Sequence, residues 1–151
     1  MESKRRLPIL QARDDVASDP RRPGWQWIGF GAVAIFVLWL PLSTVAGLIA
    51  SFLSRPAARE DGGAAVRGEL AFAVTSAIAL ALSSLAAGLV VGKWGGPGVG
   101  VRQAALSAVL AVIVAVIASW ISFGFAPEAL LVMAIAVPAA ALGGRAGRSA
   151  R

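Results

Sequence analysis

The 151-residue chain contains no cysteine and no histidine. Without cysteine, disulfides, thiol nucleophiles and zinc–thiolate sites are excluded, and without histidine the commonest metal ligand and general base is missing. The chain has serine hydroxyls, but no histidine is present to activate them as nucleophiles. We therefore expect a protein that is not an enzyme and that binds neither a metal nor a cofactor.

Charged residues are also scarce, at 15% of the chain, whereas hydrophobic residues make up 58%. This hydrophobic content exceeds that of a usual soluble domain and indicates lipid as the solvent. Lys and Arg outnumber Asp and Glu by 14 to 8. In a membrane protein such an excess reflects the cytoplasmic bias of basic residues, so we expect the lipid bilayer and not nucleic acid as the partner.

Long stretches without formal charge alternate with polar segments. The stretch 25–53 is longer than the ~20 residues that cross a bilayer and too long for the apolar core of a signal peptide. Uncharged runs of span length follow at 70–91 and 103–123. A fourth span is expected at 126–144, with a re-entrant or interfacial helix as the alternative. The sequence thus predicts an all-α membrane protein with four transmembrane helices arranged as two antiparallel hairpins.

The segments that flank this predicted transmembrane domain (25–144) carry the charges. Residues 1–24 are expected to form a disordered tail of mixed charge, 54–69 a solvated loop, and 145–151 a basic tail. With both termini in the cytoplasm, 11 of the 14 Lys and Arg residues lie on the cytoplasmic side, as the positive-inside rule requires. Arginine-rich, alanine-rich composition is typical of bacteria with GC-rich genomes, so we expect a multi-pass protein of the bacterial inner membrane. The residues expected to fix this topology and to meet lipid headgroups are Arg21, Arg22, Lys93, Arg102, Arg145 and Arg148.

Small residues recur at four-residue spacing on the second and third predicted spans. Such stripes let the backbones of two membrane helices approach closely. The two spans are joined by a short glycine turn, so we expect their stripes to pack on each other; association with another copy or another membrane protein is the alternative. The helix-packing residues are Ser84, Gly88 and Gly92 on the second span and Ser107, Ala111, Ala115 and Ser119 on the third.

Two prolines interrupt predicted spans. Pro41 and Pro138 each remove a backbone hydrogen bond and are expected to kink their helices. Ser43 and Thr44 follow Pro41 and could bond the freed carbonyls. A hinge or binding notch at Pro41 is the functional interpretation, although proline is also simply tolerated in membrane helices. Trp39 lies too deep in its span for the interfacial aromatic belt, so we expect it between helices.

The glycine-rich segment 95–100 superficially resembles a phosphate-binding loop. It follows no strand, Lys93 precedes the glycines, and no Ser or Thr occupies the position of a magnesium ligand. We interpret the segment as a tight turn at the membrane surface.

The runs 86–93 and 136–145 resemble small four-span bacterial membrane proteins of uncharacterised function, over roughly residues 70–148. The resemblance implies a pair of helical hairpins in the plasma membrane and transfers no catalytic or binding residue. We expect a non-enzymatic accessory or structural subunit that packs against other membrane helices. A small homo-oligomeric transporter or channel, lined near Pro41 and Pro138, is the alternative. A membrane anchor or lipid-responsive protein is a third option.

Overall fold

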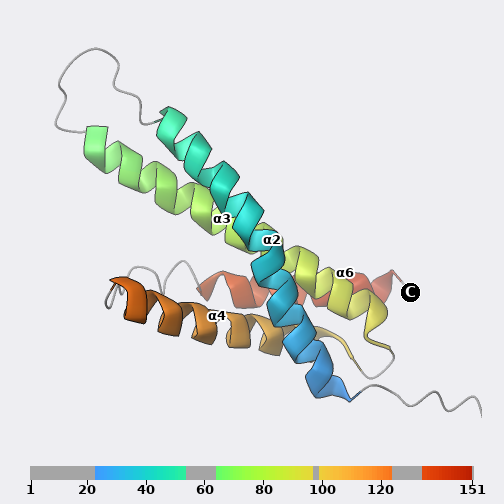
Figure 1. Cartoon of the computed structure of the whole chain (residues 1–151). Helices are drawn as coiled ribbons and strands as arrows, with labels where there is room; N and C mark the ends of the chain where they lie inside the picture. Colours follow the sequence, from blue (N-terminus) through green and yellow to red (C-terminus); the bar gives the residue numbers. More distant parts are fainter. Residues whose placement is uncertain (1–22, 54–63, 97–98, 124–133, 151) are drawn as a thin grey trace, which may run out of the picture.

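The computed structural model describes residues 23–53, 64–96, 99–123 and 134–150. This part of the chain is helical, in agreement with the predicted fold class. Three of its helices are long and apolar enough to cross a membrane, whereas the last helix has only 14 residues. The helices are α2 (Gly24–Leu53), α3 (Ala64–Trp94), α4 (Val101–Phe123) and α6 (Ala136–Ser149) (Figure 1).

The three long helices coincide with the first three predicted spans. At 1.5 Å per residue, their 30, 31 and 23 residues exceed the ~30 Å thickness of the hydrocarbon core. However, α3 begins at Ala64, earlier than the predicted boundary at residue 70, and so includes Arg67 and Glu69. Charge limits the part of a helix that can lie in lipid, but it does not prevent helical turns from continuing into water.

The fourth helix differs from the predicted span 126–144. Residues 124–133, where that span was expected to begin, lie outside the described residues. The helix α6 continues past Gly144 to Ser149 and therefore contains Arg145 and Arg148, which had been assigned to a tail. Its 14 residues correspond to about 21 Å, less than the hydrocarbon thickness. The structure thus contains a fourth helix, but α6 alone does not cross the bilayer.

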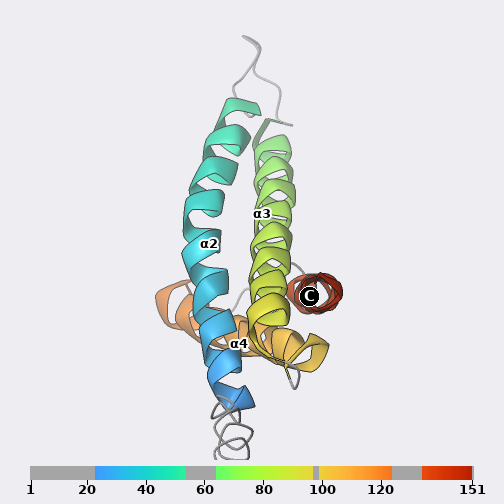
Figure 2. The ribbon, with the colours of Figure 1, turned by 90° about the vertical axis from the view of Figure 1, so that its right-hand side faces the viewer.

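The two prolines have different surroundings. Pro41 lies within α2, which continues as a single helix on both sides of it (Figure 2). The hydroxyls of Ser43 and Thr44 donate to the carbonyl of Leu40, at 2.9 and 3.0 Å, and not to the carbonyl of Val37 that lacks its usual donor. Pro138 lies in the first turn of α6, and helical structure is interrupted three residues earlier, at Ile135. Proline cannot donate to the carbonyl four residues before it, which accounts for a break near this position.

The described helices form two pairs that cross. In Figure 1, α2 and α3 run side by side in opposite directions toward the upper left, and α4 and α6 form a second pair that α2 crosses on its way to the lower right. Figure 2 shows α6 end-on beside α3, with α4 crossing behind the first pair. The pairs meet along the N-terminal half of α2 and the C-terminal half of α3. They diverge toward the ends of α2 and α4, at Leu53 and Phe123, so that the far halves of α2 and α3 extend away from α4 (Figure 1).

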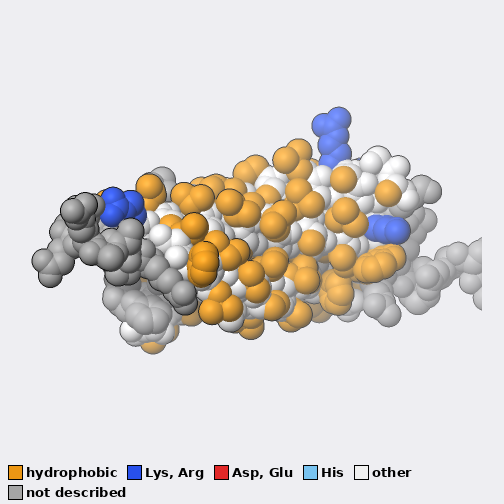
Figure 3. Space-filling model, turned by 90° about the horizontal axis from the view of Figure 1, so that it is seen from above, with side chains coloured by type: hydrophobic (Ala, Val, Ile, Leu, Met, Phe, Trp, Pro, Cys, Tyr) orange, Lys and Arg blue, Asp and Glu red, His pale blue; other side chains and the backbone are white. Residues whose placement is uncertain are grey.

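The buried core is built mostly from alanine, while large apolar side chains face outward. Seven buried residues form the main cluster, and only one of them is larger than alanine. By contrast, Ile121 is 80% exposed, and apolar side chains cover most of the face seen in Figure 3, with basic groups near the two ends. In water such a surface would promote association, whereas lipid solvates it. The cluster comprises Ala32, Ile35, Ala87, Ala108, Ala111, Ala136 and Ala140.

Candidate functional site

Glycines of α3 and α6 bring the backbones of these two helices close together. A Cβ atom placed on Gly88 or Gly92 of α3 would overlap the backbone carbonyl of Ala140 or of Gly144 on α6. Conversely, a Cβ on Gly143 or Gly147 of α6 would overlap the carbonyl of Leu85 or of Leu89 on α3. We call Gly88, Gly92, Gly143 and Gly147 the glycine interface. Each helix thus presents glycines at four-residue spacing to the carbonyls of the other, an arrangement suited to Cα–H···O contacts.

This finding corrects the expected partner of the second span. The stripe that includes Gly88 and Gly92 does pack closely, but it packs on α6 and not on the third span. The reason is that α6 lies against both helices: a Cβ on Gly144 would lie 2.7 Å from Cβ of Ala104 and 3.3 Å from Cα of Val101, both on α4. The helix α6 therefore occupies the position in which the stripe of the third span was expected.

The small residues of the third span instead face α2 and the core. Ser107 is buried; its hydroxyl donates to the carbonyl of Gln103 at 2.8 Å and lies 3.4 Å from that of Trp27 on α2. Gly31 provides the space for this contact, since a Cβ there would lie 2.7 Å from Cβ of Ser107. Ala111 belongs to the buried core, and Ser119 is half-buried.

Sequence reasoning missed Gly31, Gly143, Gly144 and Gly147 as packing residues. For two of them a signal was available, because Gly143 and Gly147 show the four-residue spacing that identified Gly88 and Gly92. The pair is not evident within the predicted span 126–144, because that span contains Gly143 but ends before Gly147.

Ser84, one turn before Gly88 on α3, is the polar member of the same stripe. It is fully buried, and its hydroxyl has no hydrogen-bond partner in the structure described. The adjacent Ser83 is equally buried, but its hydroxyl donates to the carbonyl of Ala79 at 2.7 Å. An unbonded buried hydroxyl is costly in an apolar environment, so Ser84 is a weak point in otherwise close packing.

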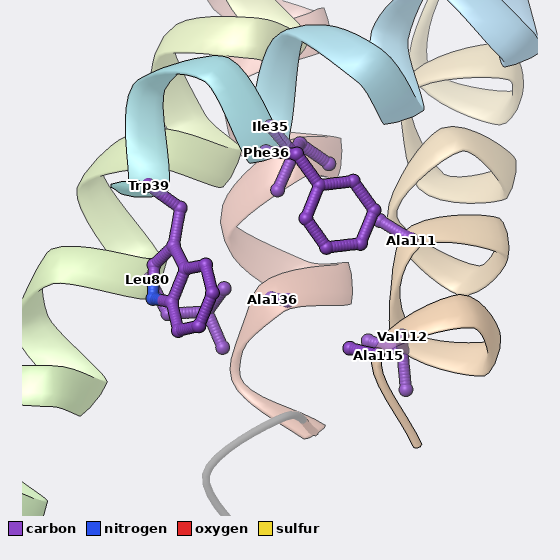
Figure 4. A pocket seen from close by; sticks show the side chains of 8 residues that line it. All are labelled: Ile35, Phe36, Trp39, Leu80, Ala111, Val112, Ala115 and Ala136. Atoms are coloured by element: carbon purple, nitrogen blue, oxygen red, sulfur yellow. The ribbon is translucent and has the colours of Figure 1, made fainter. Parts of the chain in front are cut away.

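A small apolar cavity of about 50 Å³ lies where the two helix pairs begin to diverge. In Figure 4, Phe36 and Trp39 extend from α2 toward it, and Ala136 of α6 lies opposite them. Trp39 is thus located between helices, as expected from its depth in the span. The cavity is much smaller than the about 150 Å³ space that admits benzene in an engineered apolar core. The remaining lining residues are Ile35, Leu80, Ala111, Val112 and Ala115.

The glycine-rich turn closes α3 and opens α4. Gly96 has a φ of +81°, a left-handed conformation that glycine adopts without strain at the end of a helix. The amide of Gly95 donates to the carbonyl of Val91 at 2.9 Å. At the start of α4, the side-chain oxygen of Gln103 accepts from the amide of Gly100 at 3.0 Å, which is half of a capping box. The contacts made by the described part of 95–100 are those of a turn between helices.

Four predicted headgroup contacts lie at this end of the molecule. Lys93, Arg102, Arg145 and Arg148 are all exposed. The first residue of α2 reaches the same end, since a Cβ on Gly24 would lie 3.6 Å from the side-chain nitrogen Nε2 of Gln103. Arg21 and Arg22 lie outside the described residues.

The chemistry available to the described residues is that of packing and charge. Within those ranges no group of three His, Cys, Asp or Glu side chains could hold a metal ion. Comparisons with models of protein families, with curated proteins and with solved structures gave no match.

Proposed function

We propose that this protein is a non-enzymatic accessory subunit of a bacterial inner membrane that packs against the helices of another membrane protein. The observation that carries the proposal is the divergence of the two helix pairs. The far half of α2 and the first half of α3 extend side by side away from α4 and α6 (Figure 1), and they carry exposed apolar side chains such as Leu48, Leu53 and Phe72. A partner helix that covers these faces would complete the bundle.

The distribution of small residues supports the same proposal. The glycine interface is already occupied within the chain, so it holds the subunit together rather than recruiting a partner. The diverging halves carry larger side chains, including Phe36 and Trp39 at the base of the divergence. Large apolar side chains offer a partner helix more contact area than small ones, and their shape restricts which partner surface can pack against them.

The proposed topology has four crossings, with residues 126–144 providing the last one, and both termini in the cytoplasm. The beginning of α2 and the basic end of α6 lie at the same end of the molecule, as an even number of crossings requires. The resemblance to small four-span bacterial membrane proteins is part of this proposal.

The test is isolation of the tagged protein from its own membrane, followed by native mass spectrometry. We expect a stoichiometric second membrane protein, and its recovery should fall when Leu48, which is 65% exposed on α2, is replaced by alanine. The matched control is Leu142→Ala on the outer face of α6, which is 62% exposed and should leave the complex intact. Recovery of the wild-type chain only as a monomer would refute the proposal.

A further inference from the structure

We propose that the basic end of the molecule binds the headgroup of an anionic phospholipid between α6 and the start of α4. The inference assumes the membrane insertion proposed above, but it does not depend on a protein partner. It starts from the position of α6, whose buried face carries Gly143, Gly144 and Gly147. With that face held against α3 and α4, Arg145 and Arg148 lie one turn apart on the exposed side.

A third arginine lies in the first turn of α4, whose beginning is covered by the side chain of Arg148. The Cδ and Nη1 atoms of Arg148 would each lie 3.5 Å from a Cβ on Gly100, so this side chain lies over the start of α4. Arg102 follows two residues later and is exposed. On the other side, the backbone of Gly92 and Lys93 contacts Gly147. Cationic side chains from α3, α4 and α6 therefore converge on one end of the bundle.

Basic residues outnumber acidic ones in the segments that meet at this end, since even residues 1–24 contain six Lys and Arg against four Asp and Glu. No Asp or Glu occurs between Glu69 and Glu128 or after Glu128. Within the described ranges Glu69 is the single acidic residue. It lies near the start of α3, at the end of the molecule opposite to the basic end, and two residues after Arg67. The two ends therefore differ in net charge, and the apolar belt between them places the basic end at the depth of the headgroups (Figure 3). Basic sites between helices at a membrane surface are suited to anionic headgroups, and each cation contributes about fivefold in affinity.

The experiment uses the full chain in detergent, mixed with equal amounts of phosphatidylglycerol and phosphatidylcholine of identical acyl chains, and counts retained lipids by native mass spectrometry. We expect wild-type protein to retain phosphatidylglycerol preferentially. The double variant Arg145→Gln/Arg148→Gln should reduce that preference about 25-fold, whereas the control Arg67→Gln at the opposite end should preserve it. Circular dichroism checks that each variant keeps its helices.

Three results would overturn the inference: equal retention of both lipids by the wild type, an unchanged preference in the double variant, or an equal loss in Arg67→Gln. In a further experiment, excess inorganic phosphate is added at constant ionic strength as a competitor. If phosphate displaces phosphatidylglycerol, the site is one for free phosphate instead. Flotation of reconstituted protein with phosphatidylcholine vesicles tests insertion separately. A failure of lipid selectivity is therefore distinguishable from a failure of the membrane assignment.

Discussion

Replacing Gly143 with alanine should loosen α6 from α3, although the change adds a single methyl group. That methyl group would overlap the carbonyl oxygen of Leu85 and lie 2.9 Å from both the Leu85 carbonyl carbon and the Leu89 nitrogen. All three atoms belong to the backbone of α3 and cannot rotate aside, so the helices must separate. Overpacking of this kind costs about 1–3 kcal/mol, and each weakened Cα–H···O contact adds about 0.5–1 kcal/mol. We therefore expect Gly143→Ala to destabilise the fold by about 2–4 kcal/mol.

The chain provides a matched control for this substitution. Gly29 and Gly47 also lie within a helix, but a Cβ on either would meet nothing within 4 Å. Alanine there gains helix propensity without a clash, so Gly29→Ala should be neutral or stabilising by up to about 1 kcal/mol. Comparing the two variants separates the steric effect from the general effect of replacing a helical glycine.

Two measurements would check this prediction. Unfolding in increasing SDS, followed by circular dichroism, gives the loss of stability. Hydrogen exchange followed by mass spectrometry should show faster exchange in α6 than in α2 for Gly143→Ala. The double variant Gly88→Ala/Gly143→Ala should cost less than the sum of the single variants, because the first methyl already separates the helices. Equal stability of Gly143→Ala and Gly29→Ala would refute the assignment of this interface.

Other substitutions test further parts of the structure. Ala115→Val adds methyl groups beside the cavity and should be neutral or stabilising by about 1 kcal/mol. By contrast, Ala108→Val, in the buried core and away from the cavity, should destabilise by about 1–3 kcal/mol in the same SDS titration. Pro41→Ala restores a backbone donor within α2 and should raise the SDS midpoint; a lower midpoint would show that α2 requires the proline. Because the chain lacks cysteine, Glu69→Cys and Ser149→Cys can each be labelled selectively in cells. The proposed topology predicts that an impermeant thiol reagent labels the first directly and the second only after permeabilisation.

The absence of charge predicted the spans well because lipid imposes a simple physical requirement on any helix that crosses it. It predicted helix ends poorly, since Arg67 and Glu69 end the apolar run without ending α3. The four-residue spacing of small residues identified Gly88 and Gly92 as contact residues. Such spacing describes one face of a helix, but it does not indicate which other helix packs against that face. In a chain so rich in alanine, both α4 and α6 offered a small face. The choice between them depended on the reciprocal glycines of α6, whose backbone could approach more closely than the alanines and serines of the third span.

The position of α6 also has a consequence for biosynthesis. Its contact surface on α3 and α4 is complete before α6 itself leaves the ribosome, so newly made chains pass through a stage in which Gly88 and Gly92 are uncovered. An α6 from a second copy fits that surface equally well. Two chains can therefore misassemble by exchanging this helix, which gives a domain-swapped dimer. Covalent linkage gives the chain's own α6 a high effective concentration and favours correct closure. Crowding of nascent chains during overexpression works against that advantage, so swapped dimers should increase with the rate of synthesis.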